Sequence, residues 1–72
     1  MTESVRVYVN ARGVDVPRGA TVAEALRHWN ADEAAAAARG ERAVTDSRGL
    51  PVLLSDTVAQ GSIVRVVGAR AG

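Results

Sequence analysis

His28 is the only histidine in this 72-residue chain, and imidazole is the side chain best suited to proton transfer near neutral pH. A catalytic histidine needs a partner, but the chain has no cysteine that it could activate. Spacing along the chain places no serine or aspartate beside it. The GxGxxG, GxSxG and HExxH patterns of catalytic sites are also absent. We therefore interpret His28 as an exposed helix residue and predict that the chain is not an enzyme.

The composition excludes further kinds of chemistry. All nine basic side chains are arginine, so a P-loop lysine, a Schiff-base lysine and a lysine general base are impossible. Without cysteine there can be no disulfide, iron–sulfur cluster or zinc–thiolate site. The net charge of +1, with acidic residues spread along the chain, argues against a polybasic surface for nucleic acid or membrane.

Three residues near the middle of the chain have both a functional and a structural interpretation. Asp32 and Glu33 are adjacent carboxylates that a cation can use, but at the start of a helix they more often serve the cap and the helix dipole. We expect no metal site and no cofactor. Trp29 offers a binding platform, but it ends an apolar helix stripe, which favours a place in the core.

The segment Asp46-Ser47-Arg48-Gly49 is the most polar turn in the chain. It is either a solvated turn or part of a surface that contacts an acidic partner or RNA. Aromatic residues make up only 3% of the chain, so a stacking platform for nucleic-acid bases is not expected. If this surface binds a partner, the sequence assigns to it the following residues: Arg42, Asp46, Arg48, Arg65 and Arg70.

Length and hydropathy predict one small domain with a thin core. No apolar run approaches the roughly 20 residues of a membrane span. The amino-terminal Met-Thr-Glu-Ser lacks the basic-then-apolar order of a signal peptide. The expectation is a soluble cytoplasmic protein, and the sequence leaves its oligomeric state open.

The segment from Thr21 to Trp29 is the clearest helix. Thr21 and Glu24 have the spacing of a capping box, in which each side chain bonds the backbone N–H of the other residue. Val22, Ala25, Leu26 and Trp29 fall at i, i+3, i+4 and i+7, which forms one apolar stripe. We expect this stripe to cover a sheet, with Leu26 and Trp29 packed against Val5, Val7, Val16, Ile63 and Val66.

The strands that this helix covers are predicted from alternation. Residues 4–10 alternate strictly, with valines on one face and Arg6 and Tyr8 on the other. A turn at 10–13, in which Gly13 supplies a positive φ, leads to a second short strand and completes a hairpin. The nearly continuous apolar run 63–67 predicts a central strand that lies parallel to the first strand.

The middle of the chain gives weaker signals. Asn30 can end the first helix, Asp32 can cap a short second helix over 33–39, and Gly40 can stop it. The alternative for this alanine-rich segment is a mobile loop. Residues 42–45 predict a short strand, and 50–54 predict a strand that is short or at an edge because Pro51 cannot donate a hydrogen bond.

Three stretches resemble the β-grasp, ubiquitin-like fold, and within it the small sulfur carriers of thiamin and molybdopterin synthesis, the ThiS/MoaD-like family. They are the opening Val-Arg-Val-Tyr-Val-Asn, the phrase from Val16 to Leu26, and the phrase from Val58 to Val64. The resemblance implies an α+β fold with a mixed four- to five-stranded sheet packed on one main helix. It also implies a single β-grasp domain over 1–68 and a flexible carboxyl-terminal tail over 69–72.

The resemblance implies a function for that tail. In this family an adenylating enzyme activates the terminal glycine carboxylate with ATP, and sulfur then replaces an oxygen to give a thiocarboxylate. Gly72 would be the activated residue, and Ala71 stands where the family has a second glycine. The implied partners are the adenylating enzyme and a sulfur-accepting synthase, and the pathway stays open. The alternative is a non-catalytic β-grasp interaction module whose surface, and not its tail, binds a protein partner.

Overall fold

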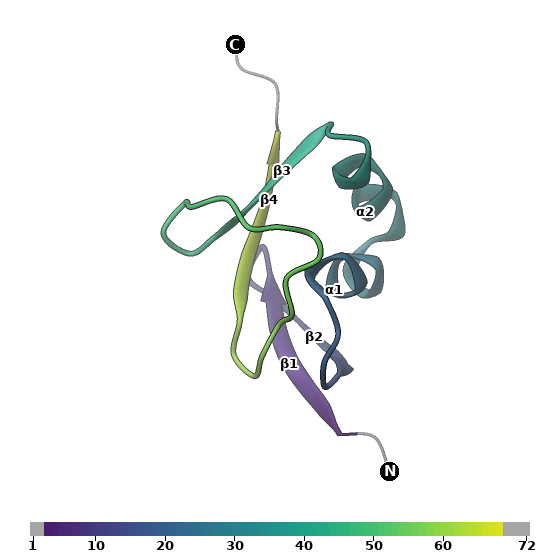
Figure 1. The fold of residues 1–72 in the computed structure, drawn as a ribbon, viewed down its shortest axis with the longest axis vertical. Helices are drawn as coiled ribbons and strands as arrows, with labels where there is room; N and C mark the ends of the chain where they lie inside the picture. Colours follow the sequence, from purple (N-terminus) through teal and green to yellow (C-terminus); the bar gives the residue numbers. More distant parts are fainter. Residues whose placement is uncertain (1–2, 69–72) are drawn as a thin grey trace.

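A mixed four-stranded sheet carries two short helices in the computed structural model, which describes residues 3–68 (Figure 1). The strands are β1 (Ser4–Val9), β2 (Arg12–Pro17), β3 (Arg42–Asp46) and β4 (Ile63–Gly68), and the helices are α1 (Val22–Trp29) and α2 (Ala31–Ala38). The strand order is β2-β1-β4-β3, in which β1 and β4 are parallel and the other pairs antiparallel. The chain thus forms a small compact α+β unit.

The predicted central strand is confirmed, since β4 lies between β1 and β3 and runs parallel to β1. The prediction that Ile63 packs under the helix is wrong. Pairing with β1 sets Ile63 beside Tyr8 and Val64 beside Val9, so Ile63 shares the face of Tyr8 and is 46% exposed. Val64 and Val66 are the residues of β4 that enter the core.

Helix α1 begins as its sequence predicts. The Glu24 backbone N–H donates to Thr21 Oγ1 at 3.3 Å, and the Thr21 backbone N–H donates to Glu24 Oε1 at 3.1 Å, which completes the capping box. Val22, Ala25 and Leu26 are buried against the sheet. Trp29, which ends the stripe, is half-buried at the margin of the core.

The second helix forms, but its predicted cap is wrong. Asn30, not Asp32, is the N-cap, and its Oδ1 accepts from the Glu33 backbone N–H at 3.1 Å. Asn30 also ends α1 through its own N–H, so one residue joins the helices directly. Gly40 ends α2 at a φ of +82° in a Schellman motif. Residues 3–68 therefore contain two eight-residue helices in place of the one main helix expected.

The predicted strand over 50–54 does not form. Only an isolated bridge between Thr45 and Pro51 connects this segment with β3, and the described part of the chain has a four-stranded sheet. Val52 and Leu54 still pack against the core, and Val58 is buried within the same long connection. Within residues 3–68, neither helix is long and apolar enough to cross a membrane.

Candidate docking surface on the open sheet face

The sheet has one covered face and one open face. Both helices pack on the face that carries the inward-pointing valines of β1, β2 and β4 (Figure 1). The opposite face leaves three large apolar side chains in contact with water: Tyr8 is 38% exposed, and Ile63 and Val67 are each 46% exposed. They come from the two central strands, so they lie in the middle of the sheet and not at its rim.

These side chains surround a shallow hollow of about 670 Å³ on the open face. Its walls come from β4, from the end of β1 and from the turn that follows β1. The lining residues, which we call the outer-face hollow, are Tyr8, Asn10, Ala11, Ile63, Arg65 and Val67. Side chains exposed together in a concave, mostly apolar site are typical of surfaces that bind another molecule.

Arg65 is the charged member of the outer-face hollow. It lies on β4 between the outward-facing Ile63 and Val67 and is exposed. Among residues 3–68, no carboxylate lies within ion-pair distance of its guanidinium, whereas five other arginines have such a partner. The hollow therefore combines apolar walls with a positive charge that the described part of the chain does not neutralise.

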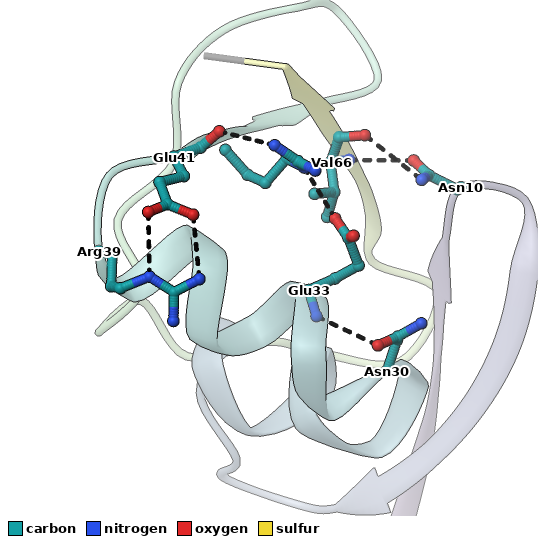
Figure 2. A network of polar contacts seen from close by, with 7 residues as sticks. Asn10, Asn30, Glu33, Arg39, Glu41 and Val66 are labelled. Atoms are coloured by element: carbon teal, nitrogen blue, oxygen red, sulfur yellow. Dashed lines mark hydrogen bonds and ion pairs between the residues drawn. The ribbon is translucent and has the colours of Figure 1, made fainter. Parts of the chain in front are cut away.

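The turn between β1 and β2 forms one wall of the hollow in an unusual backbone conformation. Asn10 and Ala11 have φ values of +50° and +69°, as a type I′ hairpin turn requires. The Asn10 amide donates to the Val66 carbonyl at 3.3 Å, and Asn10 Oδ1 accepts from the Val66 N–H at 2.9 Å, which joins the turn to β4 (Figure 2). Alanine is strained in this region, and such strain is concentrated at functional sites.

Gly13 has a different role from the one predicted. It does not take a positive φ but lies within β2 opposite Tyr8. A Cβ at Gly13 would lie 3.3 Å from Arg6 Cδ and 3.4 Å from Tyr8 Cε1. The absence of a side chain thus lets Arg6 and the Tyr8 ring lie across the strand at this point.

Arg6 and Asp15 form an ion pair next to this ring. Arg6 Nε donates to Asp15 Oδ1 at 2.9 Å, and Nη2 donates to Oδ2 at 3.2 Å. The hydrogen bond from Arg6 lowers the pKa of the Asp15 carboxyl, and the same bond raises the pKa of Arg6. Both side chains are more than half exposed, so the pair contributes little to stability.

The structure separates the predicted surface arginines. Arg42 lies on the helix side of β3, where it donates to Glu33 at 2.9 Å, so it is on the opposite side of the sheet from Arg65. Asp46 uses its carboxylate inside its own turn, and Arg48 pairs with it at 3.2 Å. Arg70, Ala71 and Gly72 lie outside the described residues.

The remaining candidates are placed as structural residues or as surface. His28 is exposed on α1, and Glu33 takes part in the α2 cap and the Arg42 ion pair. Within residues 3–68, no group of three histidine, cysteine, aspartate or glutamate residues could hold a metal ion. The outer-face hollow offers a guanidinium and a phenol among apolar groups, and such groups are suited to binding another molecule.

Sequence reasoning missed most of the outer-face hollow, although two signals pointed to it. Alternation assigned Tyr8 to the face opposite the valines of β1, and Ile63, Arg65 and Val67 alternate in the same way. Only the parallel pairing of β1 with β4 shows that the two sets lie on the same face.

No protein-family model, curated protein or solved structure matches the chain.

Proposed function

We propose that this chain is a β-grasp, ubiquitin-like sulfur carrier that binds its adenylating enzyme through the outer-face hollow. The element order supports the proposal: an antiparallel hairpin, a helix that covers the sheet, and a last strand that lies centrally and parallel to the first. The lack of a catalytic constellation also fits, since a carrier of this type supplies a substrate group and no catalysis.

One observation carries the proposal. Strand β4 contributes Ile63, Arg65 and Val67 to the hollow, and it runs directly into the tail over 69–72. A partner on the hollow would therefore hold the strand from which the reactive segment continues in the chain. Because binding on the sheet holds that segment near the enzyme, the reaction of the tail becomes effectively intramolecular.

The proposed chemistry involves the terminal carboxylate alone. In the adenylating enzyme, a carboxylate oxygen of Gly72 attacks the α-phosphorus of ATP, and pyrophosphate leaves. Hydrosulfide then attacks the acyl carbon of the adenylate, the bond between that carbon and the phosphate-bound oxygen breaks, and AMP leaves with the oxygen, which gives the thiocarboxylate. For this proposal Gly72 must carry a free carboxylate, and Ala71 must pass through a channel that accepts one extra methyl group.

The charge of the hollow specifies the enzyme surface that fits it. A carboxylate on the enzyme would complement Arg65, and apolar side chains on the enzyme would complement Tyr8, Ile63 and Val67. Aromatic and arginine side chains contribute most to binding when a partner removes them from water. We therefore expect the enzyme to offer an apolar patch with an acidic residue opposite Arg65.

The alternative is a β-grasp interaction module that uses the same hollow but not its tail. The strained turn at Ala11 and the exposed apolar face favour a binding surface whether or not the tail reacts. The alanine at position 71, where the family has glycine, also favours this function. The two functions differ in what happens at Gly72.

Binding to the purified adenylating enzyme of the same organism tests the proposal. We expect Arg65→Glu to weaken binding by about tenfold or more, because it places a carboxylate opposite an acidic surface. Arg27→Glu is the matched control: Arg27 is also exposed, has no ion-pair partner within residues 3–68 and lies on α1.

Deletion of Gly72 separates the two functions. The carrier should still bind the enzyme through the hollow after the deletion but should no longer be adenylated. Equal loss of binding in Arg65→Glu and Arg27→Glu would show that the hollow is not the docking surface. A folded wild-type protein that does not bind the enzyme at all would favour the interaction module.

A further inference from the structure

Strand β2 forms one edge of the sheet and has backbone groups that face away from β1. Hydrogen bonds from Tyr8 to Ser62 and from Asn10 to Val64 show that the even-numbered residues of β1 point toward β4. The odd-numbered residues of β1 therefore point toward β2, where they pair with Arg12, Val14 and Val16. The N–H and C=O groups of Gly13 and Asp15 consequently point outward from the sheet.

These outward groups form a short and well-defined edge. No backbone bond within residues 3–68 uses the N–H or C=O of Gly13 or Asp15. Pro17, the next residue in this alternation, has no N–H, and its carbonyl accepts from Ala20. On the other side, Ala11 lies in the turn at positive φ. The edge thus offers two donors and two acceptors that a further strand can pair with.

We propose that this edge pairs with β2 of a second copy of the chain, antiparallel and centred on Val14. In this register Gly13 of each copy lies opposite Asp15 of the other, so both residues exchange two hydrogen bonds. All four outward groups of each copy then have partners. The two four-stranded sheets join into one continuous sheet, with the helices of both copies on the same side.

Neighbouring registers fit worse. Centring the pair on Gly13 would place Asp15 opposite Ala11, whose φ of +69° is not extended. Centring it on Asp15 would place two carboxylates directly opposite each other and would set Gly13 opposite Pro17, which lacks an N–H. Of these three registers, only the one centred on Val14 avoids a non-extended partner residue, a missing donor and a like-charge pair.

The side chains beside the edge fit the same register. Arg6 lies across Gly13, with its Cδ 3.3 Å and its Nε 3.7 Å from the position that a Cβ there would take. Asp15 of the second copy would lie opposite Gly13, within reach of that guanidinium. Each Arg6 would then contact two carboxylates. On the helix side, the half-buried Val14 of each copy would meet its equivalent at the closest approach of the two strands.

Sedimentation equilibrium and amide hydrogen exchange on the wild-type protein test this inference. Four backbone hydrogen bonds and one valine pair make a small contact, so we expect weak association that becomes measurable at protein concentrations up to about 1 mM. The Gly13 and Asp15 amides should become protected as the concentration rises. A monomer at that concentration, or protection at other amides in place of these two, would overturn the inference.

A pair of variants separates the contribution of the backbone hydrogen bonds to self-association from the contribution of the Asp15 charge. Asp15→Pro and Asp15→Ala both remove the carboxylate, but only proline also removes the outward N–H. We expect Asp15→Pro to abolish association and Asp15→Ala to weaken it by several-fold. Circular dichroism checks that both variants fold. If Asp15→Pro is unfolded, the amide protection of the wild-type protein decides alone.

Arg65→Glu is the control that keeps this inference independent of the proposed function. Arg65 lies on β4 of the open face and does not approach the edge of β2, because β1 lies between the two strands. The Arg65→Glu variant should self-associate as the wild type does but should no longer bind the adenylating enzyme. Loss of self-association in Arg65→Glu would contradict the pairing through β2.

Discussion

Ala11 is the residue whose backbone conformation is least suited to its side chain. Its φ of +69° is a region that costs an L-residue about 1–2 kcal/mol and that glycine adopts readily. Ala11→Gly should therefore raise the free energy of unfolding by about 0.5–1 kcal/mol, after the extra entropy of glycine in the unfolded chain is subtracted. Urea denaturation measures the difference.

The same substitution elsewhere gives the control. Ala35 is exposed in the interior of α2, where glycine should lower the free energy of unfolding by about 1 kcal/mol. The two alanine-to-glycine changes should therefore have opposite signs. If both destabilise the protein, then Ala11 is not strained, and backbone strain does not mark the outer-face hollow.

Asp46 makes stability depend on pH. Its Oδ1 accepts the backbone N–H groups of Arg48 at 2.8 Å and Leu50 at 3.0 Å. The hydrogen bond from Leu50, and after it the bond from Arg48, lowers the pKa of the Asp46 carboxyl. A lowered pKa in the folded state means that the stabilisation is complete above the ordinary aspartate pKa of about 3.9. It is lost as the pH falls toward the folded value.

Asp46→Asn should keep the acceptor but remove this titration. We expect the variant to be less stable than the wild type at about pH 6, and the difference to shrink as the pH falls to about 2.5. Urea midpoints across this range measure it. A constant difference between the two proteins at every pH would show that the charge of Asp46 does not stabilise the turn.

At the scale of the element, α1 depends on its capping box. The N–H groups of the first helical turn have no partner within the helix, and Thr21 Oγ1 satisfies one of them. Thr21→Ala should lower the free energy of unfolding by about 1 kcal/mol, measured by urea denaturation. Thr21→Ser keeps the hydroxyl and should retain most of that stability. Equal losses in both variants would assign the effect to the lost methyl group and not to the cap.

The elements differ in how far their sequences predict them. Both ends of α1 could be predicted because a capping box and an apolar stripe are local chemistry. The sequence predicts Asp32 as the cap of α2, but Asn30 caps it, because α1 passes into α2 through Asn30 with no loop between the helices. Residues 50–54 are apolar enough for a strand, but they form only one isolated β-bridge with β3, and three of their side chains are exposed.

For strand β4, the sequence predicts the strand but not which of its faces points toward the core. Apart from Arg65 its residues are apolar on both faces, so apolar character alone does not decide whether Ile63 or Val64 points inward. The register with β1 decides, because Val64 lies beside the buried Val9 and Ile63 beside the exposed Tyr8. The outer-face hollow could be predicted only in part for the same reason: its two groups of residues, 8–11 and 63–67, are more than 50 positions apart in the chain and meet only through this pairing.

At the scale of the whole molecule, three surfaces have separate roles in the proposed account. The helices cover one face of the sheet and form the core with it. The open face carries the outer-face hollow, and the edge at β2 remains accessible beside it. A second copy at the edge would leave the hollow of each copy open, so self-association and enzyme docking do not compete for the same residues.

Intact mass spectrometry tests whether the chain is a carrier that docks through the outer-face hollow. The wild type, Arg65→Glu and Arg27→Glu are each incubated with ATP, magnesium, a sulfur source and the adenylating enzyme of the same organism. A known carrier that the same enzyme modifies serves as the positive control. We predict a mass increase equal to one sulfur-for-oxygen exchange, located at Gly72, in the wild type and in Arg27→Glu but strongly reduced in Arg65→Glu. No increase in the wild type, while the known carrier is modified in parallel, would contradict the account.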